Sequence, residues 1–530
     1  MPHPLGVKPK PIKSPLPEFT AGAAKIIETA IEKNDLDFFY KLYLAKMVEL
    51  SLTGKGKEFI EFSKSGIDDS PTGLIMAQGF EAIGSMIDLN FTKCLSILDN
   101  LENTTENLEI NKWVLQISNL CRAHINFHKG DFSQSLHYAR AALDSPIKSG
   151  SLDPIDQGRL IRLVCSIKLI QSDINGVNNC AQEILSISNP ENLNDLTHTK
   201  SAIRAMQLLV QGDYKQAYEI ASAVVQLEEV AGRSGITSPF DCRAVMARCL
   251  YEFSQHDQAI EMLEISKTKA LASKSNTIYW LCEVGQIRVL AQDINNFGQV
   301  TVRLEKLRVE LMKNTTLDKL HWLLDLAEVF FRHTTNENRR VASLVNRNPA
   351  NPYIQMLGRS QAKELNARDI KSVEALPEGT PFEIIYKNLL LSQFAGQGIK
   401  KQQKYLAAAL NKAEEVGARE IFLRQDNLTL ESVINISEKI NSQWVESLAN
   451  ACLDRINSRN ALLNFRGEQL THREIEVLKY LTTSKSIEQI GRSLHISKNT
   501  MKTHLRNIYR KLDVTDRNKA AEVAKEKLIV

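Results

Sequence analysis

A chain of 530 residues is too long for one compact hydrophobic core, so several units or an elongated array are expected. Its composition, 43% hydrophobic and 24% charged with few aromatic residues, is that of a foldable soluble protein and favours helix. The net charge of +4 is uneven, because residues 466–530 carry 14 Lys and Arg against 8 Asp and Glu (+6), which leaves −2 for residues 1–465. A basic C-terminal region on a near-neutral body is typical of a module that binds an anionic partner.

The N-terminal segment and the cysteines indicate a reduced, cytoplasmic protein. Residues 1–19 are rich in Pro and Lys, so we expect a disordered tail and not a signal peptide. No apolar run approaches the roughly 18 residues that span a bilayer, so no membrane contact is expected. The absence of a CxxC pair disfavours a metal site or a disulfide framework, and most cysteines lie in apolar, helix-like contexts. The cysteines are Cys94, Cys121, Cys165, Cys180, Cys242, Cys249, Cys282 and Cys452.

Residues 20–445 show an almost purely helical pattern that contains an internal repeat. Apolar residues recur at three- and four-residue spacing, and a short turn followed by an Ala/Leu-rich helix returns about every 41 residues. The clearest turns are Gly130-Asp131-Phe132 and Gly212-Asp213-Tyr214. The six starts fall at positions 89, 130, 172, 212, 254 and 292, which are almost evenly spaced along the chain.

This regularity predicts a stack of helical hairpins within an all-α fold. Gly or Ser permits the tight turn, and the following Asp accepts hydrogen bonds from the local backbone. One hairpin cannot bury its own apolar face, so neighbouring hairpins are expected to stack into a superhelix with a concave surface. The units resemble tetratricopeptide repeats, although their period exceeds the usual length of about 34 residues. Further helices are expected over 317–332 and 382–416, and 446–468 is predicted to be a linker.

Four short helices are predicted in the last segment, residues 469–530. Thr471 with Glu474, and Ser486 with Gln489, have the spacing of capping boxes that begin the first two helices. The turn at 495–497 leads to a third helix over 498–512, and Asp516 begins the fourth. Two short helices joined by a tight turn are the geometry that holds a second helix in the DNA major groove.

The third helix divides into an apolar face and a basic face. On a helical wheel of about 100° per residue, Met501, Leu505, Ile508 and Leu512 form one apolar stripe. The segment 498–511 holds five Lys or Arg residues and no acid. Arg and Lys can read guanine edges, Thr offers a methyl or a hydroxyl group, and other polar residues contact phosphates. The residues predicted to contact DNA are Lys498, Asn499, Thr500, Lys502, Thr503, His504, Arg506, Arg510 and Lys511.

The C-terminal segment resembles the LuxR-type helix-turn-helix signature almost end to end. Matching positions include Leu470, Thr471, Arg473, Glu474, Val477, Leu478, Ile490, Leu494, Ser497, Thr500, Lys502, His504, Ile508, Lys511, Leu512, Val514, Arg517 and Ala520. The resemblance implies that Lys502, Thr503 and Arg506 face bases, and that Asn499, Thr500, His504, Arg510 and Lys511 lie near the DNA backbone. It also implies dimer contacts by the fourth helix, and therefore a homodimer on paired half-sites of double-stranded DNA in a bacterial cell.

Two residues depart from the pattern of this family. Ser484 stands where the family usually has Gly, at a position that would end the first helix with positive φ, and this is expected to cost about 1 kcal/mol. Gly491 replaces the usual Ala in the second helix, at roughly another 1 kcal/mol. Neither residue lies on the face predicted to read DNA.

The helical body resembles that of the large, maltose-activator-like LuxR-family regulators. Those proteins carry an ATPase domain before the repeats, whereas this chain holds no GxxxxGK[ST] motif, and Thr53-Gly54-Lys55-Gly56-Lys57 lacks the required spacing. His124 and His128 are four residues apart but have no third ligand in view, so packing or surface histidines are the favoured interpretation. No catalytic residue, metal site or cofactor is predicted.

Three functions remain open from the sequence. The leading hypothesis is a sequence-specific transcriptional regulator, not an enzyme, whose helical body (20–445) receives a protein partner or a small ligand. The alternative is a helical-repeat interaction scaffold with a weak or auxiliary DNA-binding domain. A third, an ATP-dependent switch, requires a nucleotide site outside the known pattern.

Overall fold

The computed structural model describes most of the chain between residues 50 and 526. The described residues are 50, 55–65, 71–104, 108–144, 154–187, 194–230, 240–272, 275–293, 296–313, 321–334, 338–347, 371, 373–393, 398–425, 427–461, 464–465, 468–512 and 514–526. Segment 1–19, for which the sequence predicts disorder, lies outside them, as do residues 51–54.

The predicted all-α class is confirmed for the described residues. The helices are α3 (Gly56–Ser65), α4 (Pro71–Ile87), α5 (Phe91–Thr104), α6 (Leu108–Lys129), α7 (Phe132–Leu143), α8 (Pro154–Ile170), α9 (Ile174–Ser186), α10 (Asn194–Gln211), α11 (Tyr214–Val230), α12 (Phe240–Glu252), α13 (His256–Ala272), α14 (Asn276–Leu290), α15 (Phe297–Lys313), α16 (His321–Thr334), α17 (Asn338–Arg347), α20 (Pro381–Ser392), α21 (Ile399–Val416), α22 (Glu420–Leu423), α23 (Asn427–Ser437), α24 (Gln443–Ala461), α25 (His472–Leu481), α26 (Ile487–Ser493), α27 (Lys498–Leu512) and α28 (Arg517–Glu526). Two strands of two residues each, β1 (Asn464–Phe465) and β2 (Glu468–Gln469), form one antiparallel pair.

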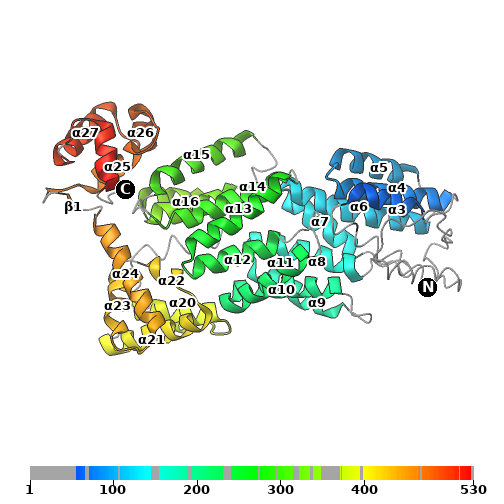
Figure 1. Ribbon diagram of the computed structural model, residues 1–530, viewed down its shortest axis with the longest axis horizontal. Coiled ribbons are helices and arrows are strands. Elements are labelled where there is room, and N and C mark those ends of the chain that lie inside the picture. The colour runs from blue at the N-terminus through cyan, green and yellow to red at the C-terminus, as the bar shows by residue number, and fades with distance from the viewer. Residues whose placement is uncertain are drawn as a thin grey trace. The chain divides into compact units, whose positions relative to one another are not determined.

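The described helices form two compact units. Unit 1 runs up to Gln207 and adds Glu219–Val245 and Thr268–Tyr279, and unit 2 holds Leu208–Tyr218, Met246–Lys267 and the residues from Trp280 onward. In unit 1, α4 packs on α5, α6 on α7 and α8 on α9 (Figure 1). In unit 2, α16 packs on α17, α20 on α21 and α23 on α24. Consecutive helices therefore pair as hairpins, as the repeat predicts.

The first five predicted repeat starts share one backbone turn. At each start a residue with left-handed φ ends one helix: Leu89 (58°), Gly130 (82°), Ser172 (59°), Gly212 (83°) and Ser254 (61°). The N–H of that residue donates to the carbonyl three residues back, and the next N–H donates to the carbonyl five residues back. For Gly130 and Asp131 the acceptors are the carbonyls of Phe127 and Asn126, at 3.0 and 2.9 Å. This is the Schellman turn, which satisfies the last carbonyls of a helix. The sixth start, Gln292, is also described by the structure and is not left-handed.

An Asx side chain then begins the next helix in four of these turns. Asp131, Asp173 and Asp213 accept hydrogen bonds from the backbone N–H groups three residues later, at 3.2, 2.8 and 3.3 Å. Asn90 makes the same bond to the N–H of Lys93 at 3.2 Å. The predicted role of Asp in the repeat is therefore confirmed as an N-cap, which satisfies one free donor at a helix start.

Replacing Gly212 with Ala is expected to lower the free energy of unfolding by about 2–3 kcal/mol. A non-glycine residue at positive φ costs roughly 1–2 kcal/mol, and the added Cβ of this one would lie 2.8 Å from the backbone nitrogen of Phe382 in α20. Gly398 is the matched control, because its φ is also +83° and nothing lies within 4 Å of its Cβ position. Thermal and urea unfolding of both variants measures the difference, and equal losses would contradict a steric role for the α20 contact.

Small and sulfur-containing residues are part of the buried core of the helical body. All eight cysteines are buried free thiols, as expected for small apolar residues in helix contacts. Ala139 and Ala142 of α7 and Ala181 of α9 are buried in the same way. In the part of the chain that the structure describes, no helix has the length and apolar composition needed to cross a bilayer.

The predictions for the end of the body are partly confirmed. Helix α16 occupies most of 317–332, and α20 and α21 cover most of 382–416. The predicted linker 446–468 differs, because α24 runs to Ala461. Its buried Val445, Leu448 and Cys452 give the helix an apolar side that the polar residues near 457–460 obscured in the sequence.

Candidate nucleic-acid interface

The C-terminal domain consists of four short helices that begin where the sequence predicts. Thr471 caps α25 and Ser486 caps α26, and both capping boxes are complete. The Thr471 N–H donates to Glu474 Oε2 at 2.7 Å, and the Ser486 N–H donates to Gln489 Oε1 at 2.8 Å. Both hydrogen bonds of each capping box are therefore formed, and they fix where α25 and α26 begin.

The tight turn between α26 and α27 is the same Schellman turn that closes the repeat hairpins. His495 has a left-handed φ of 53°, and its N–H donates to the carbonyl of Arg492 at 3.2 Å. The N–H of Ile496 donates to the carbonyl of Gly491 at 2.9 Å. Ser497 then caps α27, because its Oγ accepts from the N–H of Thr500 at 3.2 Å. The direction of α27 is thus set by local backbone bonds.

The expectation of positive φ at Ser484 is wrong. Among the described residues, left-handed φ at non-glycine positions occurs at Leu89, Ser172, Ser254 and His495 and not at Ser484. Arg517 supplies the physical reason, since its guanidinium donates to the carbonyls of Leu481 (3.1 Å), Lys485 (2.6 Å) and Thr483. A side chain of α28 thereby satisfies carbonyls that a left-handed glycine turn would otherwise satisfy.

Gly491 is buried where α26 meets the turn. A Cβ at this position would lie 3.2 Å from the carbonyl oxygen of Ile496, which is tighter than ordinary van der Waals contact. The glycine therefore permits a close approach of the turn, and this offsets part of its low helix propensity.

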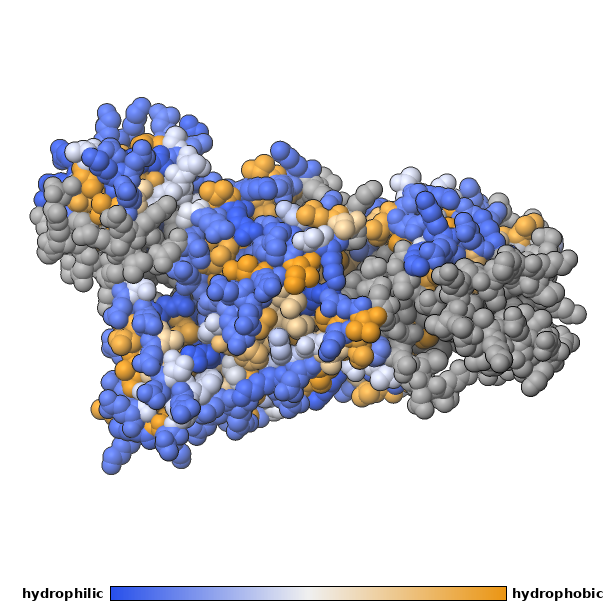
Figure 2. Space-filling view, viewed as in Figure 1, coloured by the Kyte–Doolittle hydropathy of each residue, from blue (hydrophilic) through white to orange (hydrophobic). Residues whose placement is uncertain are grey.

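Helix α27 separates its side chains as the helical wheel predicts. Met501, Ile508 and Leu512 are buried against the domain, and Leu505 is half-buried. Seven of the nine residues predicted to contact DNA are exposed: Lys498, Asn499, Thr500, Lys502, Thr503, Arg506 and Arg510. His504 is half-buried. In the space-filling view this domain presents mainly hydrophilic residues (Figure 2).

Lys498 and Thr503 make bonds inside the domain, but these bonds do not cover the exposed face of α27. Lys498 makes an ion pair of 3.3 Å with Glu488, but the two side chains are 73% and 64% exposed, so this pair is weak. The Thr503 hydroxyl donates to the carbonyl of Asn499 at 3.2 Å. The helix holds no acidic residue, so its exposed face is uniformly positive or neutral. Such a face can bind the edges of bases and the phosphates of a nucleic acid.

Lys511 is placed differently from the other predicted DNA-contact residues. Its ammonium group donates to Glu474 Oε2 at 2.7 Å, and its side chain is 12% exposed. Burial by itself raises the pKa of Glu474, but hydrogen bonds from Lys511 and Thr471 hold this pKa below its usual range. One carboxylate therefore closes the capping box of α25 and fastens the C-terminal end of α27. A DNA contact by Lys511 remains a prediction.

Replacing Glu474 with Ala is expected to destabilise the domain by about 2–3 kcal/mol, because it removes a cap bond and leaves Lys511 without this partner. Because the folded-state pKa of Glu474 is depressed, its stabilising effect is present above the unfolded pKa of about 4.3 and is lost as pH falls through the folded pKa. Hydrogen exchange of the α25 amides in the full chain measures the loss. Glu488→Gln is the control, since its exposed pair with Lys498 is worth less than about 1 kcal/mol. Equal effects of the two changes would contradict this assignment.

Comparison with known proteins agrees with the geometry of this domain. Residues 468–524 match the family model described as bacterial regulatory proteins, luxR family. The segment is a LuxR-family helix-turn-helix domain. The family model does not cover the helical body. No solved structure matches the chain at a significant level.

The relatives of this LuxR-family domain are transcriptional regulators. The chain is 48% identical over 59 residues (11% of the chain, 27% of the relative) to the probable csgAB operon transcriptional regulatory protein of Salmonella typhimurium. It is 34% identical over 113 residues (21% and 52%) to the transcriptional regulatory protein LiaR of Bacillus subtilis. It is 40% identical over 63 residues (12% and 7%) to the HTH-type transcriptional regulator MalT of Vibrio cholerae. The matches thus span from 7% to 52% of these relatives' lengths.

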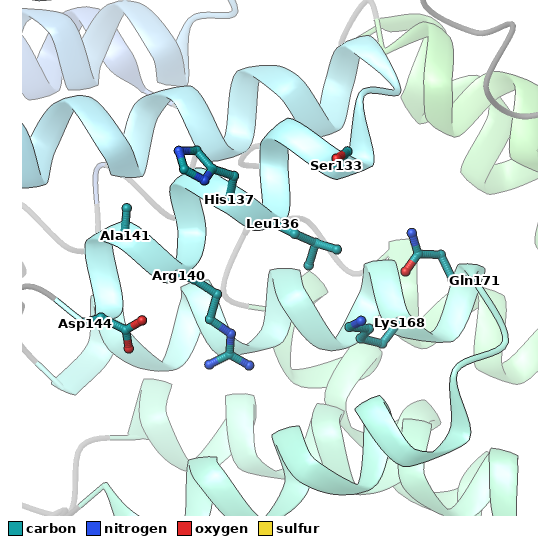
Figure 3. A pocket seen from close by; sticks show the side chains of 8 residues that line it. All are labelled: Ser133, Leu136, His137, Arg140, Ala141, Asp144, Lys168 and Gln171. Carbon is teal, nitrogen blue, oxygen red and sulfur yellow. The ribbon is translucent and has the colours of Figure 1, made fainter.

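The body that precedes the LuxR-family domain has an open hollow in unit 1. Figure 3 shows it between α7 and the end of α8. Its volume is about 680 Å³. It is lined by Ser133, Leu136, His137, Arg140, Ala141, Asp144, Lys168 and Gln171. Arg140 is paired with Glu183 at 2.7 Å and Lys168 with Asp173 at 2.9 Å. Because each cation already has a carboxylate partner, the hollow has no marked preference for an anion.

His124 and His128 are both buried in unit 1, as the packing interpretation expects. Burial first, and then the charges of His128 and Arg159, lower the pKa of His124 to about 3, so it is neutral at physiological pH. His128 Nδ1 lies 2.8 Å from the hydroxyl of Ser275. Among the described residues, no group of three or more His, Cys, Asp or Glu side chains is arranged to hold a metal ion.

Proposed function

We propose that this chain is a sequence-specific DNA-binding transcriptional regulator whose helical body receives a signal. In this proposal α27 enters the major groove of double-stranded DNA. The observation that supports it is the exposed, acid-free face of α27 in a LuxR-family domain. As a regulator of bacterial genes the protein would act in the cytoplasm, where the DNA lies.

Within this proposal the nine predicted residues take different roles. Lys502, Thr503 and Arg506 lie together on the exposed face and are assigned to base edges. The flanking residues Lys498, Asn499, Thr500, His504, Arg510 and Lys511 are assigned to the sugar-phosphate backbone, which positions the helix without reading sequence. Helix α28 is assigned to a homodimer, so the operator is expected to hold two related half-sites.

The helical body is assigned to signal reception. Stacked hairpins offer extended surfaces that accept a protein or a small ligand, and unit 1 carries a hollow of about 680 Å³. The relatives named above are all described as regulators of transcription. This supports a regulator over an enzyme for the chain as a whole.

Selection from random DNA duplexes by the full chain and by residues 466–530, at near-physiological salt, tests the proposal. A shared motif with two related half-sites is the expected result. A motif selected by the fragment alone would indicate that the body holds the domain off DNA until its signal arrives. If neither protein enriches a motif and weak binding fades with salt, as phosphate contacts do, the interaction scaffold becomes the better description.

A further inference from the structure

Two pairs of cysteines in unit 1 join helices that pack on each other. The thiols of Cys165 in α8 and Cys180 in α9 share a hydrogen bond. The thiols of Cys94 in α5 and Cys121 in α6 do the same. All four cysteines are free thiols and are 0% exposed. Two thiols that already share a hydrogen bond need only a small side-chain movement to reach the disulfide S–S length of about 2.05 Å. Both pairs therefore have the contact from which a disulfide can form.

The pair in α8 and α9 lies beside the open hollow of unit 1. Lys168, three residues after Cys165 on α8, lines this hollow together with Arg140 of α7 (Figure 3). Glu183, three residues after Cys180 on α9, accepts two hydrogen bonds from Arg140 at 2.7 and 2.8 Å. Residues three apart are neighbours on the surface of a helix. The hollow and its two cations therefore border the parts of α8 and α9 that carry this pair.

The charges around Cys180 favour a reactive thiolate. The hydrogen bond from Cys165 is the first cause that lowers the pKa of Cys180. The charges of Arg140 and Lys168 lower this pKa further, whereas burial and the charge of Glu183 act against them. The same hydrogen bond, together with burial, raises the pKa of Cys165. The thiolate is the form of cysteine that attacks oxidants, so Cys180 is suited to attack first and Cys165 to follow.

The pair in α5 and α6 has different surroundings. None of the residues that line the hollow comes from α5 or α6. The hydrogen bond with Cys94, together with burial, raises the pKa of Cys121 well above its usual range. A thiol buried in apolar surroundings is inert, whereas a thiol beside cations is reactive. The Cys94–Cys121 pair is therefore a comparison within the same unit, equal in burial and in thiol contact.

We propose that Cys165 and Cys180 form a dithiol that a peroxide oxidises to a disulfide between α8 and α9. A transient, redox-sensing disulfide is the kind that proteins of a reducing compartment form. The site goes beyond DNA binding, and only its meaning as a signal received by the body rests on the proposed function. Oxidation is measured without DNA, so its failure is distinguishable from a failure of DNA binding.

The reaction consumes one molecule of hydrogen peroxide for each disulfide. The Cys180 thiolate attacks one peroxide oxygen, the O–O bond breaks, and Cys180 becomes a sulfenic acid. The other oxygen leaves as hydroxide and takes up the proton that Cys180 had lost, which gives water. The Cys165 sulfur then attacks the Cys180 sulfur, and the S–S bond forms as the sulfenic hydroxyl leaves with the proton of Cys165 as a second water. The dithiol has lost two electrons, and the peroxide has gained them.

The competing explanation is that both pairs are only small apolar residues of the core. A purely structural role predicts that neither pair oxidises while the protein is folded, or that both pairs oxidise at the same rate. Because all four thiols are buried, peroxide reaches either pair through local opening of the helices. The proposal predicts that the pair beside the hollow oxidises first, since its surroundings are open and cationic.

The experiment treats the reduced full chain with a few-fold molar excess of hydrogen peroxide at neutral pH, without denaturant. Catalase stops the reaction, N-ethylmaleimide blocks the remaining thiols in denaturant, and peptide mapping without reductant follows each disulfide against time. We expect a Cys165–Cys180 disulfide that dithiothreitol reverses, formed about tenfold faster or more than a Cys94–Cys121 disulfide. Circular dichroism checks that the chain stays folded during the reaction.

Three variants separate the roles of the residues. Cys165→Ser should leave Cys180 as a sulfenic acid that dimedone traps, because the thiol that would close the disulfide is gone. Arg140→Met should slow the oxidation by about threefold or more, because it removes a cation beside Cys180. Lys64→Met is the control, since it removes an exposed cation of α3, and it should leave the rate unchanged.

Three results would overturn the proposal. The first is the absence of a Cys165–Cys180 disulfide in the folded chain, and the second is an equal rate for the two cysteine pairs. The third is an equal rate for Arg140→Met and Lys64→Met. The comparison of the two pairs needs no substitution, so it decides the question even if a cysteine variant fails to fold.

Discussion

Replacing both Lys502 and Arg506 with Ala is expected to weaken binding to the selected DNA motif by about 2–4 kcal/mol, roughly 30- to 1,000-fold. Both side chains are exposed on the acid-free face of α27, one turn apart. A side chain that reads a base edge contributes both affinity and discrimination, so the motif should also lose information at the bases it contacts. Fluorescence anisotropy with the selected motif and with a scrambled duplex measures both effects.

Lys519→Ala is the control for this pair, because it removes an exposed positive charge from α28 without changing α27. It is expected to reduce affinity for both duplexes by a similar, small factor. If the double substitution at 502 and 506 also weakened both duplexes equally, the two residues would contact phosphates only, and the assignment to bases would be wrong.

Replacing Arg162 with Met is expected to destabilise the protein by about 3–5 kcal/mol, the largest loss for a single change in the body. The substitution leaves Glu228 and Asp241 buried side by side without their shared cation, and their side chains are only 6% and 9% exposed. The thermal midpoint and the loss of helical circular dichroism in urea measure the effect. Because the chain contains two units and Arg162, Glu228 and Asp241 belong to unit 1, the unfolding transition of unit 1 is the one to follow.

Arg140→Met is the matched control, since the Arg140–Glu183 pair is 40% and 32% exposed and is worth less than about 1 kcal/mol. The pH dependence offers a second check. Burial by itself raises the pKa of Asp241, but the charge of Arg162 holds this pKa below its usual range. Its stabilising effect is therefore present above the unfolded pKa of about 3.9 and is lost as pH falls through the folded pKa. If Arg162→Met lowered the stability no more than Arg140→Met, the stabilising role given to the ion pairs of Arg162 with Glu228 and Asp241 would be wrong.

The repeat and the C-terminal domain could be predicted from the sequence because their signals are local. A turn residue followed by Asp, or Thr three residues before Glu, acts within one helical turn, so spacing alone locates it. The faces of α27 follow from helical periodicity in the same way. From these signals the sequence predicts the positions of the five repeat turns, the two capping boxes and the exposed side of the third helix, and the structure has them there.

The parts that could not be predicted depend on partners far apart in the chain. Arg517 satisfies carbonyls 36 and 32 residues earlier, and this removes the need for a left-handed residue at Ser484. Lys511 has the spacing of a DNA contact, but its ammonium group bonds Glu474, 37 residues earlier. Arg162 and Asp241 are 79 residues apart. In each case the partner lies far away along the chain, so spacing within one helix could not locate it.

The Schellman turn has a consequence for how the length of this protein can change during evolution. Each copy fixes the number of residues between two helices, because its two hydrogen bonds span three and five residues. An inserted residue would rotate the next helix by about 100° and turn its apolar side away from its neighbour. The intervals between the starts are nevertheless unequal, as the positions 130, 172 and 212 show. The helices differ in length, as α7 with 12 residues and α11 with 17 show. The variation therefore lies outside the hairpin turns, and these turns are the places where an inserted residue should be tolerated least.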